Sequence, residues 1–126
     1  MTRGDFQHHR IDNNGVGLHA VSLGEGPPVL LIHGFPQHWW MWRRLMRDLA
    51  ASGRRAIAFD QRGMGGSDIP LGGYGKEIVG GDAKAVLDAL GVKQASVVGY
   101  DHGGGTALSL AYQWPERVGK LALLEY

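Results

Sequence analysis

The sequence of 126 residues contains no cysteine, which excludes both a disulfide framework and a metal site built on thiolates. It has no apolar run near the roughly 18 residues that a membrane helix needs. Its first ten residues, MTRGDFQHHR, contain no apolar segment of the kind found in secretory signals. We therefore expect a soluble, cytoplasmic protein with no membrane partner.

An excess of charge of one sign is also missing. Thirteen basic residues face twelve acidic ones, which gives a formal net charge of +1. Five arginines gather between residues 43 and 55, on a predicted helix face and the loop after it, without the interleaved aromatic residues of a nucleic-acid site. We interpret them as a solvated face and expect no nucleic-acid partner.

What the sequence does contain is a 44% apolar composition, enough for one core, and 21 glycines that cluster at predicted turns. Segments 6–12 and 16–23 flank Asn13-Asn14-Gly15 and predict a β-hairpin. Strands and helices then alternate, which predicts an α/β fold with a mostly parallel sheet and helices on both faces. The expected strands are 29–32, 56–59, 95–99 and 121–124, and the expected helices begin at Trp42, near Val79 and at Gly103, the last ending before Pro115.

The last predicted strand, 121–124, is followed by only two residues. Because the edge of a sheet carries unpaired backbone groups, an apolar strand there is normally covered. We expect further polypeptide to cover this edge, either the remainder of the same protein or a second chain, which includes another copy of this one.

One carboxylate stands between glycines where a strand is predicted to turn into a helix. The segment Gly99-Tyr100-Asp101-His102-Gly103 fits the pattern of a nucleophile elbow, in which small residues on both sides permit a tight turn that exposes one side chain. A lone aspartate before a helix is more often a helix cap. The glycines alone leave the two interpretations of Asp101 open.

Two further motifs favour the catalytic interpretation. His33-Gly34-Phe35-Pro36 ends the first buried strand, and a segment from Asp60 to Asp68 follows the second. With the Asp101 motif, these resemble the α/β-hydrolase fold family, in the branch with an aspartate nucleophile that includes epoxide hydrolases, haloalkane dehalogenases and fluoroacetate dehalogenases. The resemblance runs from about Phe6 to Tyr126. It implies that residues 1–126 are the N-terminal part of a single α/β-hydrolase domain, truncated after the sixth strand, without the cap and the C-terminal part.

The resemblance also implies roles for individual residues. Asp101 would be the nucleophile, and the backbone N–H groups of Phe35 and His102 would form an oxyanion hole. The Phe35-Pro36 peptide would be cis. Glu125, directly after the last strand, would be the acid that orients a catalytic histidine. His33 and the Asp60 to Asp68 segment would be architectural.

No histidine stands where the family has its general base. The six histidines are His8, His9, His19, His33, His38 and His102. The side chain of His102 is expected to diverge from that of its neighbour Asp101, so it is poorly placed to activate water for hydrolysis of an ester on Asp101. We therefore expect the 126 residues to lack the catalytic base and cap and to be incapable of multiple turnover.

The implied reaction has two steps and needs no metal or cofactor: a carboxylate forms an alkyl-enzyme ester, and water then hydrolyses it. Dehalogenases of this branch bind halide with asparagine and tryptophan at the positions of Phe35 and His102, or bind carboxylate with arginines at positions 102 and 105. This sequence has neither pair. An epoxide hydrolase is the best match, with a dehalogenase, or an ester or lactone hydrolase, as alternatives.

Trp39 or Trp40 could line a pocket for a small apolar substrate, although aromatic residues at helical spacing more often belong to a core. A third class of function is also open, namely a truncated or split hydrolase fragment that acts as a non-catalytic assembly module. Dinucleotide binding has only Gly15-x-Gly17-x-x-Ala20 in its favour, and no helix is predicted after it.

Overall fold

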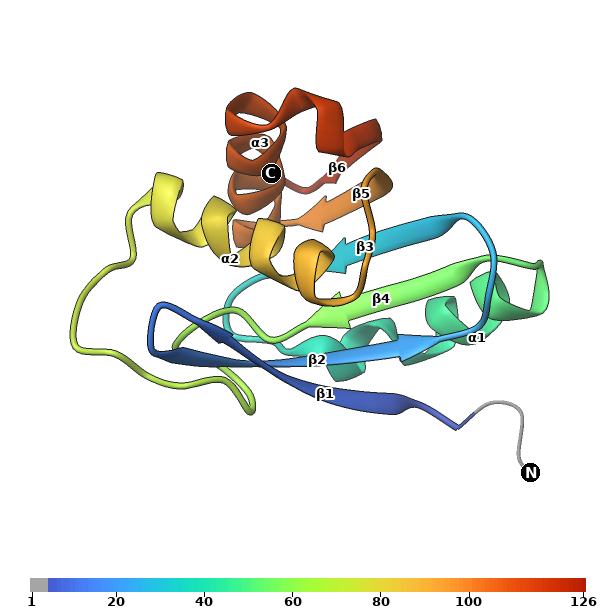
Figure 1. Cartoon of the computed structure of the whole chain (residues 1–126), viewed down its shortest axis with the longest axis horizontal. Helices are drawn as coiled ribbons and strands as arrows, with labels where there is room; N and C mark the ends of the chain where they lie inside the picture. Colours follow the sequence, from blue (N-terminus) through green and yellow to red (C-terminus); the bar gives the residue numbers. More distant parts are fainter. Residues whose placement is uncertain (1–4) are drawn as a thin grey trace.

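The computed structural model describes residues 5–126, which form a six-stranded sheet with helices on both faces (Figure 1). The first four residues of the predicted domain 1–126 lie outside the described part. The strands are β1 (Gln7–Asn13), β2 (Val16–Leu23), β3 (Pro28–Ile32), β4 (Arg55–Phe59), β5 (Ala95–Tyr100) and β6 (Val118–Leu124). The helices are α1 (Arg43–Ala51), α2 (Lys76–Ala89) and α3 (His102–Gln113), with short 3-10 turns η1 (Trp39–Trp42) and η2 (Pro115–Arg117).

The predicted hairpin is confirmed. β1 pairs with β2 antiparallel, and the register brings Ile11 opposite Leu18. Asn14 and Gly15 both have positive φ, 52° and 89°, as the commonest two-residue hairpin turn requires. The hairpin then joins the main sheet through β2, which pairs antiparallel with β4.

The strand order across the sheet is β1-β2-β4-β3-β5-β6. The pairs β3–β4, β3–β5 and β5–β6 are parallel, so the predicted mostly parallel sheet is confirmed. The carboxyl ends of β3, β4, β5 and β6 therefore open at one edge of the sheet, where α/β proteins place their reactive groups.

Two apolar clusters fill the two faces of the sheet, as the alternating strands and helices predict. On one face Met46 of α1 and Trp42 pack on strand residues such as Val29 and Leu31. On the other face α2 and α3, including Leu87 and Leu110, cover strand residues such as Leu30, Ile57 and Phe59. Alternate residues of one strand thus enter different cores, because side chains of a strand point to opposite faces.

Element boundaries differ from the expected ones by a few residues. The first helix is preceded by the 3-10 turn η1, so Trp42 is its cap and not its first residue. The third helix begins at His102, one residue earlier than expected, because the turn at Asp101 is complete within a single residue. Strand β6 begins at Val118, which pairs with Ala95 of β5; the register then shifts, and the regular ladder continues from Leu121.

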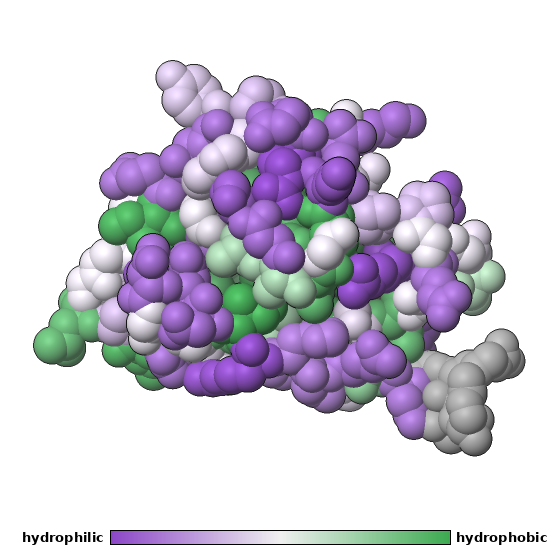
Figure 2. Space-filling model, in the orientation of Figure 1, coloured by the Kyte–Doolittle hydropathy of each residue, from purple (hydrophilic) through white to green (hydrophobic). Residues whose placement is uncertain are grey.

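β6 is an edge strand within residues 5–126. Its residues from Gly119 to Leu124 are exposed, and Leu124 is 46% accessible to solvent. Figure 2 shows that hydrophilic side chains on the face carrying α2 and α3 are interrupted by apolar patches. No helix in the described range is both long and apolar enough to cross a bilayer.

A buried ion pair ties the segment after β4 to α2. Arg62 donates from Nε and Nη2 to the two carboxylate oxygens of Asp82 over 2.6 and 2.8 Å, and Asn13 donates to the same carboxylate. Both partners are almost inaccessible to solvent. The hydrogen bond from Arg62 to Asp82 raises the pKa of the guanidinium, whose positive charge the carboxylate stabilises.

Replacing Arg62 by methionine is expected to destabilise the fold by about 3–5 kcal/mol, because it leaves the Asp82 carboxylate buried and without its cation. Urea unfolding at pH 7 measures this loss. The exposed pair Arg10–Asp68 provides the control, since Arg10→Gln should cost less than about 1 kcal/mol. Equal losses in the two variants would contradict a special contribution from the buried pair.

Candidate functional site

Three predicted site residues follow three neighbouring parallel strands. Phe35 lies in the loop after β3, Asp101 directly after β5, and Glu125 directly after β6. The backbone N–H of Asp101 donates to the carbonyl oxygen of Leu124 over 3.0 Å, which ties the ends of β5 and β6 together. The structure thus brings Phe35, Asp101 and Glu125 to one edge of the sheet.

Asp101 occupies a strained turn. Its φ of 54° and ψ of −122° are unusual for a residue other than glycine, and α3 begins with the next residue. The side chain caps no backbone N–H of α3 in the standard N-cap manner. Positive φ at a non-glycine residue persists only where surrounding contacts enforce it, and such residues cluster at functional sites.

Glycines allow the surrounding backbone to approach. A Cβ on Gly34 would lie 2.6 Å from the Cβ of Asp101, and a Cβ on Gly103 would overlap the carbonyl oxygen of Ile32. The loop after β3 therefore packs directly on the elbow. This close approach carries the N–H of Phe35 to the carboxylate.

Two backbone donors act on the Asp101 carboxylate. Hydrogen bonding by the N–H of His102, and secondly by the N–H of Phe35, lowers the pKa of Asp101. The Phe35 N–H lies 3.3 Å from Oδ2. The N-terminus of α3 adds the positive end of its dipole, which favours a carboxylate there. The site thus stabilises an ionised, half-buried carboxylate.

The side chains of Phe35 and His102 contact each other beside the Asp101 carboxylate. The rings of Phe35 and His102 form an edge-to-face contact with centroids 5.8 Å apart. Phe35 is 60% exposed, and His102 is exposed as well. The Phe35-Pro36 peptide is cis, as expected from the resemblance.

A buried polar network lies beneath the site. His33, fully buried, donates from Nδ1 to the carbonyl of Gly34 and accepts at Nε2 from the N–H of Gln61 over 2.9 Å. Burial lowers the pKa of His33, which favours the neutral ring that this pattern requires. Gln61 also donates to the His33 carbonyl and accepts from the hydroxyl of Thr106. The expected architectural place of His33 is confirmed.

Gln61 and Thr106 have no sequence signal that marks them as neighbours of this site. They are 45 residues apart, and each is an ordinary polar residue in its segment. Their contact follows from β4 and α3 lying on either side of His33, which only the tertiary fold establishes.

Asp60, at the end of β4, is a buried acceptor. Its Oδ1 accepts the N–H of Trp39 over 2.7 Å, and its Oδ2 accepts the N–H of Gly66 and a ring N–H of His19, each over 2.8 Å. Three donors therefore satisfy this carboxylate. This agrees with the predicted architectural role of the segment from Asp60 to Asp68.

The two tryptophans lie differently. Trp39 is 9% exposed and packs in the core beside α1, with its ring edge-on to Phe6 and to Trp40. Trp40 is 45% exposed, with the guanidinium of Arg43 4.7 Å from its ring. The core interpretation fits Trp39, whereas the pocket assignment of both residues stays a prediction.

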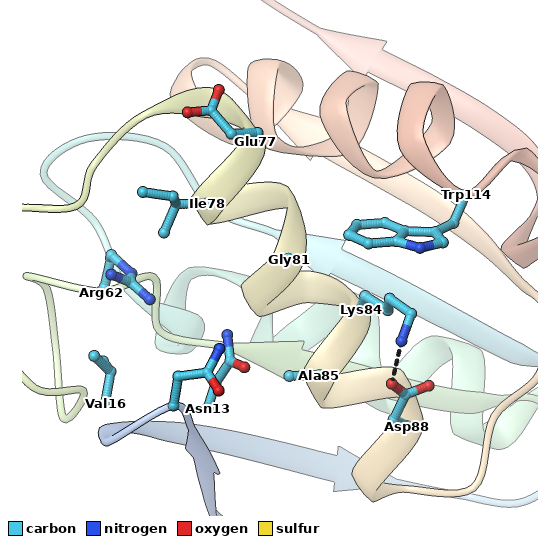
Figure 3. Close-up of a pocket in the computed structure, with 11 residues that line it drawn as sticks. Asn13, Val16, Arg62, Glu77, Ile78, Gly81, Lys84, Ala85, Asp88 and Trp114 are labelled. Carbon is cyan, nitrogen blue, oxygen red and sulfur yellow. Dashed lines mark hydrogen bonds and ion pairs between the residues drawn. The ribbon is translucent and has the colours of Figure 1, made fainter.

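Two surface hollows of about 480 and 490 Å³ lie beside α2. The first is bounded by the hairpin turn at Asn13, by Arg62 and by Trp114, with the ion pair of Lys84 and Asp88 at its rim (Figure 3). Neither hollow is lined by Asp101, Phe35 or His102. The candidate site itself is open to solvent in the described part of the chain.

Among the histidines, His102 is the one whose charge acts on Asp101, and it helps to lower the pKa of that carboxyl. Its ring contacts Phe35. His33 is engaged with Gln61, while His8, His9 and His19 lie on the hairpin. His38, which precedes η1, lies close enough to His33 for its charge to affect the pKa of that ring. Within residues 5–126 no histidine side chain is hydrogen-bonded to the Asp101 carboxylate.

Comparisons with known proteins agree with this geometry. The chain is 40% identical to "Epoxide hydrolase 2" of Siraitia grosvenorii over 121 residues, covering 94% of this chain and 38% of that protein. It is 36% identical to "Soluble epoxide hydrolase" of Corynebacterium sp. (strain C12), covering 96% of this chain and 42% of that protein. A crystal structure of an epoxide hydrolase from Vigna radiata superposes with a TM-score of 0.91 at 34% identity, over 98% of this chain and 39% of that one.

The chain thus spans about two fifths of the length of these relatives. The family described as alpha/beta hydrolase fold matches residues 27–126, from the loop before β3 to the end of the sequence. This range contains the HG-x-P loop, the elbow and all the parallel strands. The chain therefore belongs to the α/β hydrolase fold family.

Proposed function

We propose that this polypeptide carries the nucleophile half of an epoxide hydrolase, with Asp101 as the residue that bonds to the substrate. The observation that supports this most directly is the convergence of the Phe35 and His102 N–H groups on a carboxylate held at positive φ. A carboxylate kept ionised and accessible at the end of a parallel strand is suited to attack on carbon. The likeness to epoxide hydrolases supplies the substrate class.

In the first step an oxygen of Asp101 attacks an epoxide carbon and the carbon–oxygen bond of the ring breaks. The electron pair goes to the epoxide oxygen, which then takes a proton. An alkyl ester of Asp101 results. No general base is needed for this attack, because the N–H groups of His102 and Phe35 already favour the charged carboxylate.

In the second step water, activated by a general base, adds to the ester carbonyl. Negative charge then develops on an oxygen of Asp101, within reach of the same two N–H groups. Hydrolysis yields the diol and restores the carboxylate. We propose that Glu125 orients such a base; its position directly after β6, the strand that neighbours β5, supports this role.

A dehalogenase would use the same ester and differ only in the leaving group. The aromatic pair of Phe35 and His102 offers an exposed edge beside Asp101 but neither an amide nor an indole N–H for a halide. This favours the epoxide. A non-catalytic assembly module remains the alternative from another class, and the exposed edge of β6 is the observation that favours it.

Asp101→Asn is expected to reduce formation of a covalent adduct with styrene oxide by roughly 10³-fold or more, because the amide is not a nucleophile for this displacement. Intact-mass measurement detects the adduct, and peptide mapping locates it. Asp48→Asn, which removes an exposed carboxylate on α1, is the matched control and should label like the parent chain.

Within the 126 residues the ester should accumulate and diol should not be formed repeatedly, since no histidine is placed to activate water. Adducts distributed over several carboxylates, or equal labelling of Asp101→Asn, would remove Asp101 from the nucleophile role. Sustained diol production would show that the 126 residues contain a general base able to activate water.

The rate of ester formation should not fall between pH 8 and pH 5. Hydrogen bonds from His102 and Phe35 lower the pKa of Asp101, so the charged form is favoured and is lost only as pH falls through that lowered value. An ordinary aspartate has a pKa of about 3.9, which already lies below this window. Single-turnover adduct kinetics at several pH values measure the profile. A tenfold fall from pH 7 to pH 5 would be inconsistent with a pre-ionised nucleophile.

We further propose that the exposed edge at β6 is covered in the working protein, by the rest of a longer hydrolase or by a second chain. The apolar side chains of Leu121, Leu123 and Leu124 are 37 to 46% exposed there. Native mass spectrometry of the 126-residue chain should therefore show self-association. Lys substitution at Leu123 should abolish it, whereas Leu71→Lys, on the fully exposed loop before α2, should not. A monomer at all concentrations would contradict pairing between copies.

A further inference from the structure

A second set of titratable groups lies away from Asp101, on the hairpin. His8 of β1 and His19 of β2 are joined by a hydrogen bond of 2.8 Å between Nδ1 of His8 and Nε2 of His19. His19 in turn bonds through Nδ1 to Oδ2 of Asp60, also over 2.8 Å. The three side chains form a line from an exposed ring, through a partly buried ring, to a buried carboxylate.

The two rings meet edge to edge. Their planes differ by only 10° and their centroids are 5.1 Å apart. A nitrogen–nitrogen distance of 2.8 Å is shorter than the contact distance between stacked rings, so the facing nitrogens share a proton along the line that joins them. The two ring nitrogens therefore point at each other, with one proton between them. Within residues 5–126 there is no group of three or more side chains that could hold a metal ion. The geometry suits a proton better than a metal ion.

The position of each proton follows from Asp60. This carboxylate already accepts the N–H groups of Trp39 and Gly66, so it acts as an acceptor toward His19 as well. His19 therefore carries hydrogen on Nδ1, and in the neutral ring its Nε2 can only accept. His8 must then donate from Nδ1.

Adding protons changes this contact in two stages. One proton can be taken up at the solvent-facing Nε2 of His8, and the bond to His19 then becomes charge-assisted. A second proton must occupy Nε2 of His19. Both facing nitrogens are then donors, and the bond cannot form.

Other charged and titratable groups lie near the pair. On β1, His9 and Arg10 flank His8, and protonated His8 and His19 both contribute to the lowered pKa of His9, after burial and Arg55. On α1, Arg47 lies 4.9 Å from the ring of Phe6, which neighbours Trp39. Asp60 accepts the hydrogen bond from His19, and Asp68 is paired with Arg10.

The row of side chains from His8 to Asp60 also contacts Trp39, in the segment that follows the loop of the candidate site. The ring of Trp39 packs edge-on against both His8 and His19, at 5.6 and 6.3 Å, and its backbone N–H is held by Asp60. Trp39 follows the loop that contains Phe35 and Pro36. The histidine pair and Asp60 therefore both contact Trp39.

We propose that His8, His19 and Asp60 form a proton-dependent brace, which fastens β1 to the end of β4 and to Trp39 at neutral pH and opens when both histidines are protonated. The brace is independent of the reaction at Asp101.

The test is a double-mutant cycle of His8→Gln and His19→Gln, followed by urea unfolding of the full 126-residue chain at pH 7.5 and at pH 5.0, where histidines are commonly charged. At pH 7.5 the pair should contribute about a fivefold favourable coupling to the unfolding equilibrium constant, as a single hydrogen bond does. At pH 5.0 the coupling should vanish or become unfavourable. No coupling at pH 7.5, or the same coupling at both values, would overturn the proposal.

The control cycle pairs His8→Gln with His9→Gln. His9 neighbours His8 in sequence but bonds to the hydroxyl of Ser22, so this cycle should show no coupling at pH 7.5. If His19→Gln does not fold, nitrogen NMR of the parent chain and of His8→Gln tests for the hydrogen bond between the two rings. A coupling across the bond between the two ring nitrogens is expected at pH 7.5 in the parent alone and should be lost at pH 5.0; its absence from the parent at pH 7.5 would refute the brace.

Discussion

The candidate site depends on the close backbone contact between the loop after β3 and the turn at Asp101. Gly34 and Gly103 lie where any side chain would collide, with the Cβ of Asp101 in one case and with the carbonyl of Ile32 in the other. Because this contact is made by backbone, it delivers the N–H of Phe35 to the carboxylate with little conformational freedom.

The same two donors can serve two charged states in succession. Before reaction the N–H groups of His102 and Phe35 stabilise the ionised carboxylate, and during ester hydrolysis they would meet the charge on the ester oxygen. The 3.3 Å distance from Phe35 to Oδ2 is longer than a typical N–H···O bond, so this contact can shorten as charge concentrates on one oxygen. A site of this kind gives more stabilisation to the transition state than to the resting state.

The sequence predicts the local features of this structure and few of the long-range ones. Turn chemistry at Asn13-Asn14-Gly15 and the apolar run 29–32 identify the hairpin and the central strand, because the signal is contained in a few adjacent residues. The elbow at Asp101 is found the same way. By contrast, the contact of Thr106 with Gln61 joins residues 45 positions apart, and that of His19 with Asp60 joins residues 41 positions apart. No spacing in the sequence indicates either contact.

Two aspartates that each directly follow a parallel strand lie in different environments. Asp60 is buried and accepts three N–H groups from three segments, so its lone pairs are committed and its loss would leave those donors unsatisfied. Asp101 is half-buried, is held by two backbone donors at a strained turn, and keeps lone pairs directed to solvent. A saturated carboxylate fastens loops together. An unsaturated one, whose charged form backbone N–H groups favour, has the free acceptor capacity that the proposed nucleophile needs.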